Sequence, residues 1–201
     1  MSERPILFST DMVRAILDGR KTVTRRLIRP QPKTEIKSGM MGHWSIGSDV
    51  REFVCPYGVF GDKLWVRETW CNLEDDDHYK TDYIYKADEL QDDEYIRWRP
   101  SIHMPRTVAR LFLRVIDVRA ERLQDITEED AAKEGCTIYN KGKPCFPMGS
   151  GYPPTSGIDE MAECVHRASF CWKWNECYDK RGFGWDANPW VFRIEFERIK
   201  S

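Results

Sequence analysis

The chain places short apolar runs between polar turns, a pattern that predicts several short strands and few helices. The clearest alternation runs over residues 109–120, where Leu111, Leu113 and Val115 fall on one face and the residues between them are also partly apolar. Both faces of this strand are therefore predicted to be partly buried, as in a central strand. Further strands are predicted at residues 6–8, 22–28, 64–70, 83–85 and 190–197.

Helix start and stop signals predict helices over residues 11–18, 127–135 and 158–178. Ser9 or Thr10 can cap the first helix, and Gly19 supplies its left-handed end. Thr127 begins a capping box with Asp in place of the usual Glu, and Gly135 ends that second helix. The third helix is predicted from apolar residues that recur close to helical spacing.

Short strands dispersed among a few helices are typical of an α+β fold with a small mixed β-barrel, and not of a parallel βαβ sheet. No Gly-rich phosphate-binding fingerprint follows any predicted strand, which excludes the dinucleotide-binding and P-loop classes. The chain has 201 residues, no internal repeat and no domain-sized linker. It is therefore predicted to form a single domain over residues 1–201.

Composition favours a cytoplasmic protein with no membrane partner. The chain is 41% hydrophobic and 32% charged, and no apolar run approaches the length that spans a bilayer. Its first residues lack the basic-then-apolar pattern of a signal peptide. The seven cysteines form no CxxC pair, and an odd number is typical of reduced thiols rather than a disulfide framework.

The net charge of −2 hides a segregated distribution. Residues 20–37 carry seven basic side chains against one acid, and residues 97–119 carry six arginines against one acid. Residues 74–94 instead hold ten acids and two lysines. The arginine-rich segments can form a positive face for phosphates, although the same charges can equally form an ordinary solvated surface.

The segment Gly19-x-Lys21-x-x-Thr24-x-Arg26, which follows the first predicted helix, resembles the GxKxxTxR signature of the ASCH family, a branch of the PUA-like superfamily. A Gly-Asp turn at residues 61–62, the helix at 127–135 and the closing strand follow in the order expected for that family. The resemblance implies a PUA-like small mixed β-barrel with flanking helices.

The chain is longer than a minimal ASCH domain, with insertions predicted at about residues 31–58, 72–100 and 139–185. Its wider pattern resembles long ASCH proteins found in phages and prophages. That resemblance is carried by Cys55-Pro-Tyr-Gly58, Trp65-Val-Arg-Glu-Thr-Trp70 and Asn188-Pro-Trp190.

The resemblance also implies nucleic-acid or nucleoside chemistry. PUA-like barrels commonly bind RNA, and some small ASCH proteins are amidohydrolases that act on N4-acetylcytidine with a Lys, a Thr and a Glu. Carried over by motif, these residues are Lys21 and Thr24. The acid falls on Glu134, because residues 127–134 resemble the enzymes' helix that ends in the catalytic Glu. Amide hydrolysis by this set needs no metal or cofactor, and none is expected.

The residue chemistry is consistent with these roles under one geometric condition. A threonine hydroxyl needs a neighbouring base, and a lysine serves as that base only if burial or nearby cations lower its pKa. In a regular strand, however, Lys21 and Thr24 would point to opposite faces. The chain must therefore turn between them. The alternative interpretation is an ordinary strand threonine and a surface lysine.

The residues expected to contact the substrate are Gly19, Arg26, Trp65, Arg67, Glu68 and Trp70. Glu68 is also an alternative catalytic acid, although a strand carboxylate paired with an arginine would explain it equally well. The tryptophans can stack an extruded base, worth roughly 1–3 kcal/mol per base, or belong to the core.

A zinc site is not expected, although cysteines and one histidine gather late in the chain. These residues are Cys145, Cys164, His166, Cys171 and Cys177. Their spacings do not match the common structural zinc pairs, and three of the cysteines occupy apolar positions of the third predicted helix.

Three functions stay open. The first is an amidohydrolase that removes an acyl group from N4-acylated cytosine. The second is a binding module that recognises RNA or a modified nucleotide without chemistry. The third is a phage ribonuclease or counter-defence factor that uses the basic face.

Overall fold

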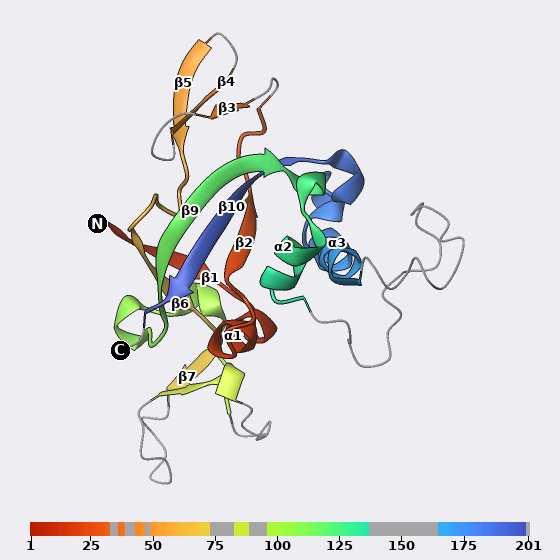
Figure 1. The fold of residues 1–201 in the computed structure, drawn as a ribbon. Helices are drawn as coiled ribbons and strands as arrows, with labels where there is room; N and C mark the ends of the chain where they lie inside the picture. Colours follow the sequence, from red (N-terminus) through yellow and green to blue (C-terminus); the bar gives the residue numbers. More distant parts are fainter. Residues whose placement is uncertain are drawn as a thin grey trace.

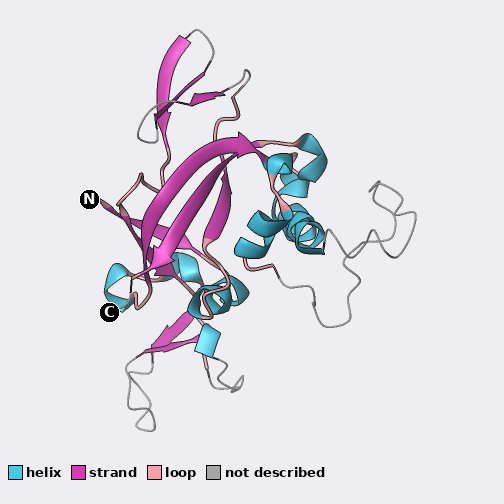
Figure 2. Ribbon diagram, viewed as in Figure 1, coloured by secondary structure: helices cyan, strands magenta, loops and turns pink. Residues whose placement is uncertain are grey.

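In the computed structural model the protein is an α+β fold, built on one main sheet with helices packed beside it (Figure 2). The structure describes residues 1–32, 36–38, 43–46, 49–72, 83–88, 96–136 and 165–199. None of the helices in these segments has the length and apolar character needed to cross a membrane.

The main sheet has five strands in the order β1-β6-β9-β10-β2 (Figure 1). Their bounds are β1 Glu3–Leu7, β6 Lys63–Arg67, β9 Phe112–Arg122, β10 Trp190–Arg198 and β2 Val23–Leu27. Only the β1–β6 pair is parallel; the other pairs in this sheet are antiparallel. Strands from both ends of the chain thus share one sheet, and the mixed arrangement confirms the predicted α+β class.

The alternating sequence of β9 and β10 explains why they are central. Leu113, Val115, Ile194 and Phe196 are buried on the sheet face that forms the main core. Helix α1, Thr10–Leu17, adds Val13 and Ile16 to the same cluster. The apolar residues whose spacing predicted these two strands and this helix therefore pack in one core.

The strands that the structure describes do not close into a barrel. β1 and β2 are the two edges of the sheet, and they form no backbone ladder with each other. A side chain connects them instead, because Nη2 of Arg26 in β2 donates a 2.6 Å hydrogen bond to the carbonyl oxygen of Leu7 in β1. The prediction of a mixed sheet is confirmed, whereas the closed barrel is not seen.

Helices α2, Glu128–Lys133, and α3, Val165–Tyr178, lie together beside the sheet (Figure 1). The Thr127 hydroxyl accepts a 3.1 Å hydrogen bond from the amide of Asp130, which is the predicted cap. A second core cluster joins these helices to the sheet through Ala131, Phe170, Trp174 and Val191. The predicted third helix is present from residue 165, and its residues 158–164 lie outside the described residues.

Two small sheets extend the fold away from the main one (Figure 1). The first comprises β3 Ile36–Ser38, β4 His43–Ile46 and β5 Asp49–Val54, within the insertion predicted at about residues 31–58. The second comprises β7 Trp70–Asn72 and β8 Tyr83–Tyr85. The strand predicted over residues 64–70 is therefore two strands, separated at Glu68 and Thr69.

Short 3-10 turns occupy Lys86–Asp88, Ser101–His103, Arg106–Val108, Leu123–Asp125, Asp179–Arg181 and Trp185–Ala187.

Candidate functional site

The Gly19 to Arg26 segment leaves α1 through a tight turn and becomes regular strand only at Val23. Gly19 has a φ of +74°, which L side chains rarely adopt. The amides of Arg20 and Lys21 then both donate 2.9 Å hydrogen bonds to the carbonyl oxygen of Ala15. Lys21 therefore stands before β2 and is free of the strict alternation that separates strand side chains. This turn lies before Lys21, and the predicted cooperation of Lys21 with Thr24 stays a prediction.

Lys21 is fully buried and its ammonium is held by three acceptors. Nζ donates to Oε2 of Glu134 at 2.7 Å, to the Glu134 carbonyl oxygen at 2.9 Å and to the Val23 carbonyl oxygen at 2.8 Å. The side chains of the ion pair are 0% and 4% exposed. The structure thus brings together the predicted base and the predicted acid.

Backbone contacts bring the end of α2 to this position. Lys21 and Glu134 form an isolated antiparallel bridge, and the amide of Thr22 donates a 2.9 Å bond to the carbonyl oxygen of Lys133. Gly135 follows with a φ of +78°, and a Cβ there would lie 2.8 Å from Cβ of Ala15 and 3.0 Å from Cβ of Lys21. Only glycine permits this close approach of α2 to the turn.

Burial is the main influence on the Lys21 amine. Loss of solvent lowers the pKa of Lys21, and the nearby Arg26 charge lowers it further, while the Glu134 carboxylate acts in the opposite direction. The net direction is downward. A lysine in this environment can lose its proton more readily than one in water.

Around this pair lies a network of two buried arginines and several carboxylates. Arg25 contacts Glu121, Asp130 and Glu134, and Arg193 binds Asp130 through two nitrogens at 2.8 and 2.9 Å. These contacts to Arg193 and Arg25 hold the pKa of Asp130 well below its usual range. The network fixes β2, β10 and α2 to one another.

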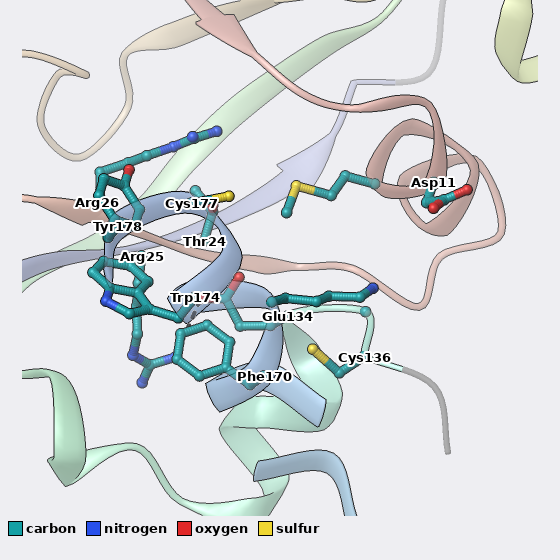
Figure 3. Close-up of a pocket in the computed structure, with 13 residues that line it drawn as sticks. Asp11, Thr24, Arg25, Arg26, Glu134, Cys136, Phe170, Trp174, Cys177 and Tyr178 are labelled. Carbon is teal, nitrogen blue, oxygen red and sulfur yellow. Dashed lines mark hydrogen bonds and ion pairs between the residues drawn. The ribbon is translucent and has the colours of Figure 1, made fainter. Parts of the chain in front are cut away.

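Thr24 lies in β2 opposite Ile194 and lines a pocket of about 80 Å³ between β2, α2 and α3 (Figure 3). The pocket is lined by Asp11, Met12, Thr24, Arg25, Arg26, Glu134, Gly135, Cys136, Phe170, Lys173, Trp174, Cys177 and Tyr178. Thr24 is 2% exposed, and the little surface it keeps faces this pocket. A hydroxyl that lines a pocket can contact a ligand bound there.

The pocket includes some of the predicted site residues and not others. Thr24, Arg26 and Glu134 line it, while Lys21 lies buried behind it in contact with Glu134. Gly19 contributes the turn rather than a pocket wall.

The four remaining predicted residues lie elsewhere. Glu68 is buried and forms a two-pronged ion pair with Arg110, with both distances 3.0 Å. Arg67 donates to the carbonyl oxygen of Ile102 and lies over the Trp65 ring. Trp70 is buried and packs against Tyr83 with ring centroids 5.8 Å apart. None of the four lines the pocket, so Glu68 is disfavoured as the acid partner.

Sequence reasoning did not identify the wall contributed by α3. Phe170, Trp174 and Tyr178 form a stepped aromatic stack in which the last two centroids are 4.3 Å apart. Their spacing of four residues along the chain was a usable signal, because residues four apart share one helix face. Their position beside Thr24 has no local signal.

No protein-family model, no curated protein and no solved structure matches this chain. The relation to the ASCH family consequently depends on the motif and stays a prediction.

In the described segments, no group of three His, Cys, Asp or Glu side chains could hold a metal ion. The ring of His166 contacts the carbonyl oxygen of Cys136 at 2.7 Å, and Cys171 is buried while Cys177 is exposed. Cys145 and Cys164 lie outside the described residues.

Proposed function

We propose that this protein is an ASCH-type amidohydrolase that removes the acyl group from an N4-acylated cytosine, with Thr24 as the nucleophile. The observation that carries the proposal is the buried Lys21–Glu134 pair, 2.7 Å apart, in which Glu134 lines the same pocket as Thr24. Buried ion pairs often add little to stability, and perturbed lysines cluster at functional sites. Catalysis gives this pair a purpose that folding alone does not.

The reaction balances with water as the only co-substrate. Oγ1 of Thr24 attacks the acyl carbonyl carbon, and its proton passes to the neutral amine of Lys21. The bond from the acyl carbon to the cytosine N4 then breaks, N4 takes up one proton, and the acyl group remains on Thr24 as an ester. Water hydrolyses that ester and releases the carboxylic acid. One water is consumed, and cytosine and the acid are formed.

Glu134 acts as the acid by relaying a proton. Its Oε2 lies 2.7 Å from Lys21 Nζ, within the range for direct proton transfer. The carboxylate accepts a proton from Lys21 and delivers it to the departing N4. Because Glu134 also lines the pocket, it touches both the base and the space where the leaving group sits.

Lys21 becomes the base by losing one of three hydrogen-bonding protons. Burial favours that loss, since it lowers the pKa of the amine. One of the three acceptors of the Lys21 ammonium is the carbonyl oxygen of Val23, the residue immediately before Thr24 in the chain. The Thr24 hydroxyl is therefore the expected group to donate its proton to the neutral amine.

The size of the pocket favours a substrate that inserts only its reacting end. A cavity of about 80 Å³ is below the roughly 300–1,000 Å³ that encloses a drug-sized ligand. The acylated edge of the base fits this scale, and the sugar with any attached chain would lie outside. Helix α3, which lies within the predicted insertion at about residues 139–185, supplies much of the wall.

The fold is proposed as an open variant of the PUA-like barrel, in which the Arg26–Leu7 hydrogen bond spans the gap between the edge strands. Non-catalytic recognition of RNA or a modified nucleotide is the second candidate function. One observation favours it: the Lys21 ammonium already has three acceptors and needs no proton transfer to be satisfied.

The test is incubation of the purified protein with N4-acetylcytidine, with cytidine and acetate measured over time. We expect equal amounts of both products, and we expect Glu134→Gln to reduce the rate by about 10²–10⁴-fold. Glu68→Gln is the matched acid control and should retain most activity in whatever fraction folds. Salt-sensitive RNA binding without product would instead support the binding module.

A further inference from the structure

Arg25 is a buried residue of β2 that the ASCH motif does not include, and it contacts three carboxylates. Its Nε lies 2.8 Å from Oε1 of Glu121, and its Nη2 lies 2.8 Å from Oδ2 of Asp130. Its Nη1 lies 3.4 Å from Oε1 of Glu134, while Lys21 occupies Oε2 of the same carboxylate. Glu134 is therefore held between two buried cations, one on each oxygen.

The charges around the two cations are unequal. Lys21 faces Glu134 at the end of α2, with the Arg26 charge and the Cys136 thiol nearby. Arg25 faces Glu121 of β9 and Asp130 of α2 in addition to Glu134, and it packs against the Phe170 ring of α3. Asp130 is shared with Arg193 of β10, which is itself also bound to Glu195. Because Asp130 is divided between two arginines, it neutralises Arg25 only in part, and Arg25 can also pair with Glu134.

We propose that Arg25 is a positioning residue that holds Oε1 of Glu134 and remains the counter-ion of this carboxylate when Lys21 gives up its proton. Without Arg25, deprotonation of Lys21 would leave a buried carboxylate with no cation in contact, a state that is strongly disfavoured. With Arg25, the carboxylate stays paired through Oε1 and can still orient the neutral amine through Oε2. The catalytic meaning of this arrangement depends on the proposed function, whereas the ionic contact does not.

The sign of the effect follows from electrostatics. Removing a positive charge near Lys21 stabilises its protonated form, so loss of Arg25 raises the pKa of Lys21. The base form then exists only at higher pH, and the acidic limb of the rate profile moves upward with it. Removing the negative charge of Glu121, which competes for Arg25, has the opposite effect.

The test is an NMR titration of Lys21 in protein labelled at the lysine ε-carbon, with the signal assigned by its loss in Lys21→Met. We expect Arg25→Gln to raise the Lys21 pKa by about one unit or more, and Arg25→Lys to raise it less. Glu121→Gln removes one partly exposed carboxylate, so it preserves the fold, and should lower the pKa. Glu3→Gln, which removes an exposed carboxylate paired with Arg106, is the matched control and should leave it unchanged.

The outcomes separate this inference from the proposed function, because the titration needs no turnover. Opposite shifts in the Arg25→Gln and Glu121→Gln variants support the counter-ion role even if acetylcytidine is never hydrolysed. If acetylcytidine is hydrolysed but the acidic limb of the pH–rate profile is the same in both variants and in wild type, the inference is overturned and the proposed amidohydrolase function still stands. If Arg25→Gln does not fold, a Lys21 pKa that is the same in Glu121→Gln and wild type also overturns it. The inference is also overturned if Lys21 stays protonated in every variant over the whole pH range in which the protein is folded.

Discussion

The buried ammonium of Lys21 lies 2.7 Å from the carboxylate of Glu134, a residue 113 positions later in the chain. Two turns make this contact possible, one at Gly19 after α1 and one at Gly135 after α2. The pair is the physical centre of the site, because Arg25 contacts it from one side and the Thr24 pocket adjoins Glu134.

Lys21→Met should lower the free energy of unfolding far more than Arg20→Met, which removes the neighbouring positive charge. Lys21→Met leaves Glu134 buried with only the 3.4 Å contact to Arg25, and loss of one partner of a buried pair costs about 3–5 kcal/mol. Arg20→Met is the control, since its pair with Asp18 is exposed and worth about 0–1 kcal/mol. Urea unfolding of both variants measures the difference, and equal free energies of unfolding would contradict the buried pair.

The two glycine turns should differ in their tolerance of a side chain. Gly19→Ala meets no atom within 4 Å, so it carries only the cost of positive φ, about 1–2 kcal/mol. Gly135→Ala carries the same cost and also places its Cβ 2.8 Å from Ala15. Thermal unfolding should therefore rank Gly135→Ala as the less stable variant. It should also lose turnover, because the new Cβ pushes Glu134 away from Lys21.

Equal melting temperatures for the two glycine variants, with turnover retained in Gly135→Ala, would show that α2 does not approach the Lys21 turn as closely as described.

Asp130 should make the protein sensitive to acid. Hydrogen bonds from Arg193, and then from Arg25, hold its pKa below the ordinary value of 3.8. The folded-state pKa is the lower one, so the carboxylate contributes its full stability above about pH 4 and loses it as the pH falls through the acidic range. Asp130→Asn should lower stability at neutral pH by about 2 kcal/mol and weaken the dependence on acid.

The matched control for this titration is Asp18→Asn, in which the carboxylate lost is exposed and bound only to Arg20. Free energies of unfolding measured between pH 7 and pH 2 should differ by a constant amount above about pH 4, and those of wild type and Asp130→Asn should converge as the pH falls further. A constant difference between them at every pH would rule out a role for Asp130 ionisation.

Local patterns predicted the fold more fully than they predicted the site. The alternation in β9 and β10, the cap at Thr127 and the glycine ends of α1 and α2 each follow from neighbouring residues, and each is confirmed. The barrel was not confirmed, because closure depends on the distance between β1 and β2 and no local pattern encodes that distance.

The site could be predicted only as far as its motif. The positions of Lys21 and Thr24 followed from the motif and that of Glu134 from a helix match, and the structure brings Lys21 into contact with Glu134. Arg25 resembles any strand arginine in sequence, and its three carboxylate partners come from positions 96 to 109 residues away. Such long-range pairing is visible only once the chain is folded.

The most direct test of the central claim is the turnover of N4-acetylcytidine by Thr24→Val, compared with Thr24→Ser and wild type. Valine keeps the branched shape of threonine in β2 and replaces the hydroxyl with a methyl group, while serine keeps the hydroxyl. We predict that Thr24→Val loses about 10²-fold or more of the rate, with its melting temperature close to wild type, and that Thr24→Ser retains measurable turnover. Unchanged turnover in a folded Thr24→Val protein would contradict the assignment of Thr24 as the nucleophile.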